Sequence, residues 1–540
     1  MLFNSYEFIF VFLPLTIAGY LLLGRSSRNW ALGWLILASV IFYAYWRPFN
    51  LLIIGPSLLV NYLFGRALLK MAGDEAQAKR RTITLALGVI FNICVLGYFK
   101  YANFAVNVAN DVSGSNFVLE NIILPLGISF ITFQKIAFLV DVAGGRVKEF
   151  SKRDFLLFVM FFPQLIAGPI VHYREMMPQF QAVEPRFNSE RFALAISLFI
   201  FGLFKKVVLA DGIAEHVSPV YAFAAAGNDP TFVQSWLAAI GYTLQIYFDF
   251  SGYSDMACGA ALFFGVRLPT NFNSPLRSTN MIDFWLRWHI TLTRFLTAYL
   301  YNPIALTLTR RRMAKKRAGL KARKSALPAF IKVLAFPTIA TMLTSGIWHG
   351  AGYTFIIWGA LHGLYLVSNH AWRQYGPKLA TGKSPSLPSR VTGFVITFFA
   401  VVLSMVFFRA PNVETAGAIL TGMAGLNGVS LPTEIAHMLK APDMPAMMTL
   451  AGEVTKGGFL LSMIWLAGLF GVAVFIPNTL EVLSRYEPTL LGPKTAPKIL
   501  GVGPAIYWSP TLPWAIFVAA LGAVCMMRLT GASEFLYWQF

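Results

Sequence analysis

Phe155–Val171 reads FLLFVMFFPQLIAGPIV, an uncharged run with two prolines and a glycine in its second half. An apolar run of this length is typical of a membrane-embedded segment. Proline and glycine interrupt helices, and irregular backbone survives at membrane depth only where it is buried in protein or lines a polar cavity. The segment therefore predicts a broken or re-entrant helix within a larger bundle of membrane helices.

The rest of the chain has the composition of such a bundle. Of its 540 residues 56% are apolar and 13% are charged, whereas soluble domains carry about 25% charged residues. This composition excludes a disordered protein, a coiled coil and an ordinary soluble enzyme. Apolar runs of about 20 residues fit helices rather than the strands of a β-barrel. We expect an all-α polytopic membrane protein with about eleven crossings.

Basic residues in alternate loops set the expected orientation. Arg25, the run Lys79–Arg81 and the cluster Arg310–Lys324 are expected on the cytoplasmic side. The loops Tyr101–Asn121 and Pro411–Lys456 are poor in basic residues and are expected outside. Both termini are then external, and the first apolar run is interpreted as a span and not as a signal peptide. The net charge of +20 is attributed to contact with anionic lipid and not to nucleic acid.

Two carboxylates lie in the apolar run Tyr247–Met256, YFDFSGYSDM. Ionisable groups inside a membrane are costly and are functional candidates by default. Asp249 and Asp255 could therefore carry protons, although hydrogen-bonded structural anchors are the more common use of such residues.

A second polar group follows in the apolar run Met281–Leu308, which we expect to be one helix. Asp283 and Arg287 are four residues apart and can form an ion pair, and Arg294 falls on the same side of a continuous helix. His289 points elsewhere on that helix. This ion pair is more often structural than catalytic.

His349 lies in a Trp-His-Gly-Ala-Gly run between two apolar stretches. The unperturbed pKa of an imidazole lies near neutrality, so a histidine can take a proton from a hydroxyl group. The small residues Gly350–Gly352 would let a ligand approach the backbone closely. A single histidine among apolar residues is more often a packing residue, and His362, on a different helix face, is interpreted in that way.

Other catalytic signatures are absent from the sequence. There is no nucleophile elbow, phosphate-binding loop or zinc-protease motif in a usable context, so covalent Ser-His-Asp chemistry within this chain is unsupported. The three cysteines have neither a disulfide framework nor metal-ligand spacing. We expect no metal and no bound cofactor.

Together these runs resemble the membrane-bound O-acyltransferase (MBOAT) family, in the branch of the bacterial alginate O-acetylation and teichoic-acid D-alanylation membrane proteins. The matching elements are FFPQLIAGPI (Phe161–Ile170), YFDFSGYSDM (Tyr247–Met256), GVRLPTNFNSP (Gly265–Pro275), DFWLRWHITL (Asp283–Leu292), and Trp348–Gly350 with Trp358–Gly363. One departure is TRFLTAYLYNPIALTLTRRR, which follows the fourth element and lacks an Arg-Asp pair and a Gly-Gly that the alginate branch carries. The sequence therefore leaves the identity of the acceptor polymer open.

The resemblance implies roles for individual residues. His349 becomes the essential histidine, proposed as general base. His289 becomes the second polar residue of the site, which other branches replace by Asn or Asp. Further residues are expected to support the substrate or the tunnel: Gln164, Asp249, Tyr253, Asp255, Asp283, Arg287, Arg294 and Trp348. Of these, Arg287 or Arg294 could meet the phosphates of an anionic donor.

The family fold is a ring of tilted and re-entrant helices around a central tunnel. On this basis residues 1–410 would form the catalytic membrane core, 411–456 a periplasmic loop, and 457–540 further transmembrane helices of the same domain. The expected location is the bacterial inner membrane.

The implied activity is transfer of an acetyl group from a cytoplasmic donor, acetyl-CoA or another acyl thioester, for O-acetylation of an exopolysaccharide such as alginate or cellulose. The implied partners are a periplasmic SGNH-type (Ser-His-Asp) acetyltransferase and a polysaccharide biosynthesis complex. Peptidoglycan O-acetylation and teichoic-acid D-alanylation are alternatives. Outside this class, a lipid or polysaccharide transporter or a structural scaffold would share the hydropathy.

Overall fold

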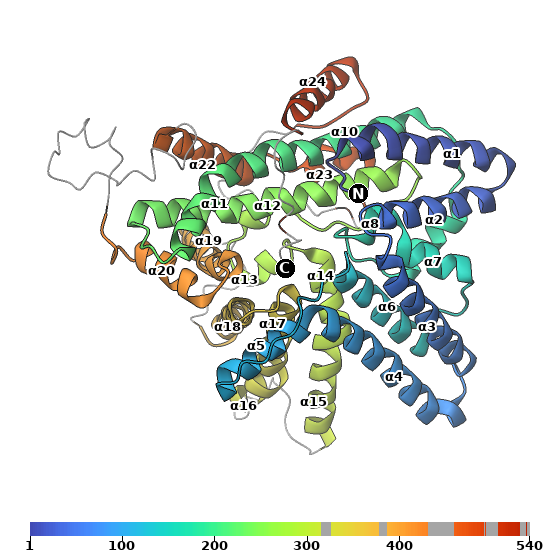
Figure 1. The fold of residues 1–540 in the computed structure, drawn as a ribbon, viewed down its shortest axis with the longest axis horizontal. Helices are drawn as coiled ribbons and strands as arrows, with labels where there is room; N and C mark the ends of the chain where they lie inside the picture. The colour runs from blue at the N-terminus through green and yellow to red at the C-terminus, as the bar shows by residue number, and fades with distance from the viewer. Residues whose placement is uncertain are drawn as a thin grey trace.

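The computed structural model describes residues 1–314, 326–376, 386–429, 458–490, 492, 506–529 and 536. Within these residues the regular structure is helical, apart from one isolated bridge between Pro269 and Leu490. Helices from all parts of the chain surround a centre occupied by the short elements α8, α13 and α14 (Figure 1).

The α-helices are α1 (Leu13–Ser26), α2 (Arg28–Ala44), α3 (Asn50–Lys70), α4 (Ala78–Leu96), α5 (Ala102–Ser113), α6 (Ile128–Ala143), α7 (Lys152–Met160), α8 (Phe162–Leu165), α9 (Tyr173–Ala182), α10 (Ser189–Phe204), α11 (Asp211–Ala225), α12 (Phe232–Leu262), α13 (Met281–Trp285), α14 (Ile290–Leu296), α15 (Asn302–Ala314), α16 (Ala326–Phe330), α17 (Phe336–His349), α18 (Tyr353–Tyr375), α19 (Leu387–Arg409), α20 (Val413–Met423), α22 (Gly458–Phe475), α23 (Thr479–Val482) and α24 (Leu512–Arg528). Short 3₁₀ turns are η2 (Glu75–Gln77), η5 (Pro275–Arg277) and η9 (Ser484–Tyr486). π-Helical turns are η1 (Glu7–Phe12), η3 (Gly97–Tyr101), η4 (Lys205–Ala210), η6 (Thr297–Tyr301) and η8 (Ile331–Ala335).

By length and composition, 6 helices among the described residues can cross a membrane. They are Glu7–Ser26, Asn50–Lys70, Glu75–Ser113, Ser189–Ala225, Leu327–His349 and Leu387–Arg409. Three shorter apolar helices, α2, most of α22 and α24, accompany them. The protein is thus an all-α, multi-pass membrane protein, and the count of eleven crossings stays a prediction.

The run that opens the sequence is broken, as its prolines and glycine predict. α7 ends at Met160, α8 forms one turn, and the chain then runs without helix to His172. Two of its backbone N–H groups donate to side chains of other segments, Phe162 to Ser39 Oγ at 3.1 Å and Ile170 to Thr291 Oγ1 at 3.0 Å. The irregular backbone is therefore buried in protein and hydrogen-bonded there.

The expected single helix over Met281–Leu308 is wrong. α13 ends at Trp285 and α14 begins at Ile290, with a turn between them. Residues 271–273 replace the helical bonds: Asn273 N donates to Arg287 O at 3.0 Å, and Ile290 N donates to Asn271 O at 2.9 Å. Because these partners come from an earlier loop, helical periodicity in the run itself could not reveal the break.

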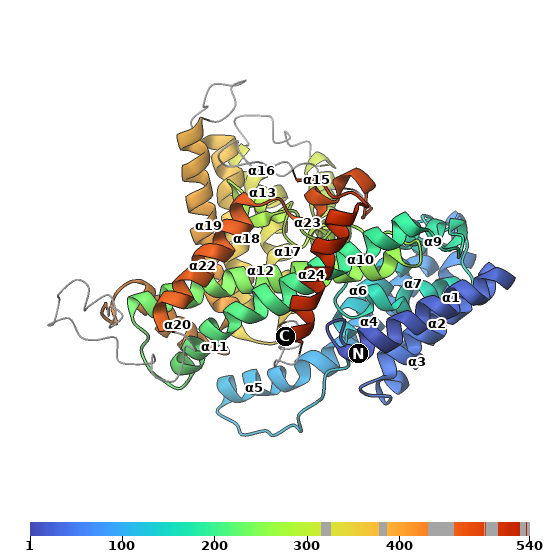
Figure 2. The same ribbon diagram turned by 90° about the horizontal axis from the view of Figure 1, so that it is seen from above.

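Two segments expected as outer loops contain helix. α4 continues through η3 into α5, so that residues up to Ser113 of the expected loop Tyr101–Asn121 are helical. α20 lies within the expected loop 411–456, whose residues 430–456 lie outside the described residues, as do residues 315–324 of the basic cluster. In the C-terminal part, α22 packs beside α12 and α24 beside α10 (Figure 2).

Contacts between distant turns define the two ends of the bundle. Arg153 donates to Asn29 Oδ1 at 2.5 Å, and Arg28 donates to Gln181 O. We name this end, which carries the basic turns, the inner face, following the expected orientation. The opposite end, where α5 lies along the lower edge of the view in Figure 2, is the outer face.

Candidate active site

His349 is the last residue of α17 and is buried inside the bundle. Three aromatic rings surround its imidazole, with centroid distances of 4.8 Å to Trp348, 5.0 Å to Trp358 and 5.2 Å to Phe408. The chain leaves α17 through extended Gly350. A Cβ atom at Gly350 would lie 2.1 Å from the Phe355 ring, so any larger residue there would displace this ring.

A cavity of about 400 Å³ is lined by His349 and Trp348. The other lining residues are Tyr43, Trp46, Arg47, Asn50, Lys100, Ile123–Phe130, Ile166 and Ala167. Most of them lie at the turn between α2 and α3 and in the segment that leads into α6, at the outer face. Trp46 is 39% exposed and Ile123 59% exposed, so the cavity connects the surroundings of His349 with the outer surface.

His289 also lies near Trp348. Its side chain is fully buried. The centroid of the His289 ring lies 6.4 Å from that of Trp348. The fold thus brings the two histidines, 60 positions apart in the sequence, onto the same indole. The backbone of His289 is left-handed, with φ 43° and ψ 53°, a conformation that costs a residue with a side chain free energy and is concentrated at functional sites.

Asn271 connects the elements that the sequence singled out. Its Oδ1 lies 3.0 Å from His289 Nδ1 and accepts from Thr291 Oγ1 at 2.8 Å. Its Nδ2 donates to Ser254 Oγ at 3.2 Å, and Thr291 Oγ1 in turn accepts from Ile170 N. Four of the five matching elements therefore meet in one hydrogen-bond network. With an amide oxygen as its partner, Nδ1 carries the proton, which leaves Nε2 as the basic nitrogen of His289.

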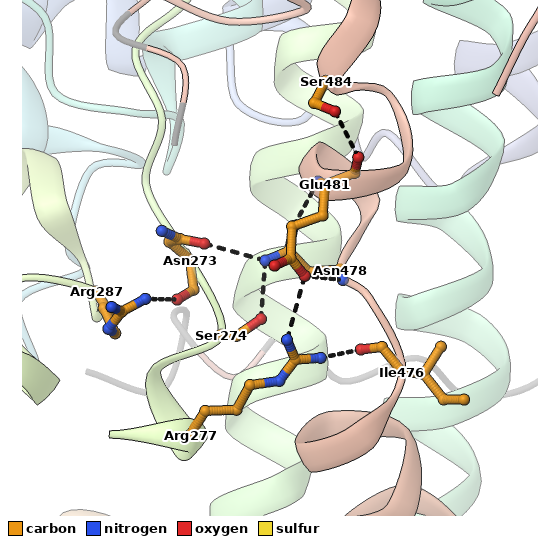
Figure 3. A network of polar contacts seen from close by, with 8 residues as sticks. All are labelled: Asn273, Ser274, Arg277, Arg287, Ile476, Asn478, Glu481 and Ser484. Atoms are coloured by element: carbon orange, nitrogen blue, oxygen red, sulfur yellow. Dashed lines mark hydrogen bonds and ion pairs between the residues drawn. The ribbon is translucent and has the colours of Figure 1, made fainter. Parts of the chain in front are cut away.

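The loop that carries Asn271 is held from the C-terminal part of the chain (Figure 3). Asn478 Nδ2 donates to Asn273 Oδ1 at 3.1 Å and to Ser274 Oγ at 2.8 Å. Arg277 pairs with Glu481 at 3.2 Å and donates to a main-chain oxygen at the end of α22. Ser274 is left-handed, with φ 48°. Residues after α22 thus fix a strained loop that positions the buried imidazole.

The two membrane carboxylates each face a lysine of the π turn η4. Asp249 lies 2.5 Å from Lys206 Nζ, which also pairs with Asp211 at 2.8 Å. Asp255 lies 2.6 Å from Lys205 Nζ. Neither aspartate lines the cavity, and the geometry is that of buried ion pairs which join α12 to the α10–α11 helix.

Each of the two arginines expected to meet donor phosphates is paired with a carboxylate. Arg287 Nε lies 2.9 Å from Asp283 Oδ1, so the expected i,i+4 pair is present although α13 ends between them. Arg294 pairs with Glu175. The expectation that Arg294 shares a face with Asp283 is wrong, because the turn at residues 286–289 reorients the chain.

The remaining expected supporting residues lie in the core. Gln164 Nε2 donates to Phe158 O at 2.5 Å, and the Tyr253 ring stacks on Phe3 at 4.9 Å. Neither residue is among those lining the cavity. His362 Nδ1 accepts from the Trp285 indole at 3.3 Å, and its Nε2 lies 2.9 Å from Ser404 Oγ. Both ring nitrogens of His362 are therefore hydrogen-bonded within the core.

The sequence reasoning missed two residues. Asn271 lies in a matching element but received no role, and Lys100, which lines the cavity, received none either. The available signal for Lys100 was a lysine directly after the apolar run Ile83–Phe99, which by itself is equally typical of a helix end at the membrane surface.

The chain matches a family model and is similar to several known proteins. The family model described as "MBOAT, membrane-bound O-acyltransferase family" matches residues 143–320. A peptidoglycan O-acetyltransferase of Helicobacter pylori is 41% identical over 80% of this chain and 81% of its own. The probable alginate O-acetylase AlgI of Pseudomonas aeruginosa is 38% identical over 78% of this chain and 75% of its own, and that of Pseudomonas putida 33% identical over 100% of both. With identities of 33–41% over most of each chain, this protein belongs to the membrane-bound O-acyltransferase family and is one of its membrane enzymes.

Proposed function

We propose that the protein is a bacterial inner-membrane O-acetyltransferase that passes an acetyl group from a cytoplasmic thioester, acetyl-CoA, to the outer face for O-acetylation of an envelope polysaccharide. The observation that carries this proposal is the cavity between His349 and the outer surface. A hydroxyl acceptor outside the membrane can reach the imidazole there. A passage from the inner face would complete the central tunnel of the family fold.

The chemistry requires one base. As the acceptor oxygen attacks the thioester carbonyl carbon, His349 takes the hydroxyl proton. The C–S bond breaks, and the thiolate leaves with the proton that the imidazole returns. Both imidazoles lie near Trp348, and His289 Nδ1 is held by Asn271. We assign His289 the orientation of the acyl group or the acceptor and keep His349 as the base.

The acceptor is proposed to be an exopolysaccharide such as alginate or cellulose. A periplasmic SGNH-type acetyltransferase would offer the first acceptor hydroxyl and then pass the acetyl group on to this polymer. Peptidoglycan is the second candidate, because the relative at 41% identity is named a peptidoglycan O-acetyltransferase. D-alanylation has less support, since the teichoic acid D-alanyltransferase of Bacillus subtilis is 27% identical over 54% of this chain.

The test is a deletion strain that carries either the wild-type gene or His349→Ala, with equal amounts of membrane protein verified by immunoblot. Alkali-labile acetate is then measured separately in secreted polysaccharide and in purified muropeptides by mass spectrometry. We expect the wild-type gene to restore acetate in one fraction and His349→Ala to restore none, since a lost general base costs about 10²–10⁴-fold in rate. Full acetylation by His349→Ala would refute the proposal, and the fraction that is restored decides between the acceptors.

A further inference from the structure

Lys100 holds the end of the helix that carries His349. Its Nζ donates to Trp348 O at 2.5 Å and to His349 O at 3.0 Å. The neighbouring Tyr101 donates its hydroxyl to Ile347 O at 2.7 Å. Lys100 also lines the cavity that His349 lines, so that one side chain contacts both the helix end and the candidate reaction space.

The need for such a cap follows from helix geometry. The last four carbonyls of a helix have no partner within it, and water does not satisfy them in a membrane interior. In α17 the first of the four, on Gly346, accepts from Gly350 N at 3.3 Å. Lys100 and Tyr101 satisfy the remaining three. The ammonium also lies where the helix dipole favours positive charge.

The π turn η3 (Gly97–Tyr101) sets which side chains reach α17. A π turn contains one residue more than an α turn, so the residues after it are rotated by about 100° relative to a regular helix. Because both Lys100 and Tyr101 lie in this turn, the irregularity and the cap are one feature of the fold. Single π turns in long helices are frequent at functional sites.

We propose that Lys100 is a positioning residue for acyl transfer: by binding the main-chain oxygens at the end of α17, it fixes the imidazole of His349 at the cavity wall. This inference rests on the proposed role of His349 as base. It assigns no proton transfer to the lysine.

The experiment uses membrane vesicles that contain the full-length protein, with radiolabelled acetyl-CoA as probe and rates normalised to folded protein by fluorescence-detected gel filtration. Lys100→Ala is expected to lower Vmax by about 10- to 100-fold, the effect of a small misplacement of a reacting group. The KM for acetyl-CoA is expected to stay unchanged. Lys332→Ala removes an exposed lysine of η8, on the helix that leads into α17, and should leave Vmax unchanged.

Two further readouts separate positioning from a general loss of structure. Lys100→Arg keeps a cation with several donors and should retain most of the Vmax. Ethylammonium, which replaces the deleted end of the side chain, should restore transfer to Lys100→Ala but not to His349→Ala. A loss that neither arginine nor ethylammonium restores would overturn the inference, as would an unchanged Vmax in Lys100→Ala.

Should Lys100→Ala yield no folded protein, Tyr101→Phe decides, because it removes one capping bond and no charge. A lower Vmax at unchanged KM supports the inference, and an unchanged Vmax overturns it. His349→Ala is measured in the same vesicles. Activity of His349→Ala refutes the proposed function, whereas an inactive His349→Ala beside a fully active Lys100→Ala refutes the role of the lysine alone.

Discussion

The left-handed backbone of His289 explains which residue types can occupy its position. Residues with a side chain rarely adopt positive φ, but Asn, Asp and His are enriched among those that do. The resemblance implies that other family branches carry Asn or Asp here. At φ 43° these three residue types share a tolerance for the turn between α13 and α14, and they share a polar group that can bind the Asn271 amide.

This conformation predicts different outcomes for two substitutions of His289. His289→Asn should fold, whereas His289→Val should lose about 1–2 kcal/mol more stability, because a left-handed conformation is costly for a β-branched residue. Thermal unfolding of both variants in one detergent measures the difference. Equal midpoints would show that the backbone strain is unimportant at this position.

The amide of Asn271 should matter for rate as well as for stability. Asn271→Ala removes the bonds to His289 and Thr291, and unsatisfied buried groups cost about 1–3 kcal/mol each. We expect a lower midpoint of unfolding and a transfer rate reduced at least about tenfold per folded molecule. Asn228→Ala, which removes an exposed bond to Phe223 O, is the control. A normal rate in Asn271→Ala would remove Asn271 from the site.

At this scale the sequence singled out His349, His289 and Trp348 because they lie in recognisable runs. The fold brings both imidazoles to the Trp348 ring, and their roles in catalysis stay predictions. Lys100 contacts main-chain oxygens of α17, and Asn271 contacts the side chain of His289. These contacts form only when distant segments meet, so no local sequence pattern indicates them.

At the scale of the element, glycines allow two pairs of helices to pack closely. A Cβ atom at Gly346 of α17 would lie 2.2 Å from Phe355 O of α18. A Cβ atom at Gly202 of α10 would lie 2.5 Å from Gly252 O of α12. Small residues that let backbones approach are the usual means of helix association in membranes, and here one of the pairs carries His349.

Gly346→Ala should therefore destabilise the protein by about 1–3 kcal/mol or more, since the backbone of α18 would have to move. Gly33 in the middle of α2 has open space around it, and Gly33→Ala should leave stability unchanged or raise it by up to about 1 kcal/mol. Unfolding midpoints of the two purified variants test the pair. Tolerance of Gly346→Ala would show that α17 and α18 separate readily.

The sequence predicted elements well where the cause lies within the run itself. The long apolar helices satisfy their own hydrogen bonds, and the prolines and glycine of Phe155–Val171 interrupt that segment. It failed over Met281–Leu308 because Arg287 O and Ile290 N bond to the earlier loop at 271–273. Such an exchange of partners depends on tertiary structure, and helical periodicity contains no information about it.

At the scale of the whole molecule, basic turns and the cavity lie at opposite ends. The expected orientation places Glu75 inside, whereas Val118, 94% exposed, lies in the segment after α5 at the outer face. In a cysteine-free background, Val118→Cys should react with a membrane-impermeant maleimide on intact spheroplasts. Glu75→Cys should react only after lysis. The reverse pattern would invert the topology and place the cavity on the cytoplasmic side.

In the C-terminal part of the chain, an apolar composition by itself says little about what individual residues do. Beyond residue 410 the sequence offered only apolar runs, yet Asn478 and Glu481 hold the loop that carries Asn271 (Figure 3). Their contribution depends on two side chains at a helix start, which composition does not distinguish from an ordinary cap.

The outward cavity also has a pharmacological consequence. Its walls combine an imidazole, two indoles, a lysine and an arginine with many aliphatic side chains, and mostly apolar pockets of about 300–1,000 Å³ suit drug-sized molecules. In the expected orientation, an inhibitor that fills it would bind from the outside of the cell membrane. Such a compound would need neither permeation of that bilayer nor resistance to the efflux and metabolism of the cytosol.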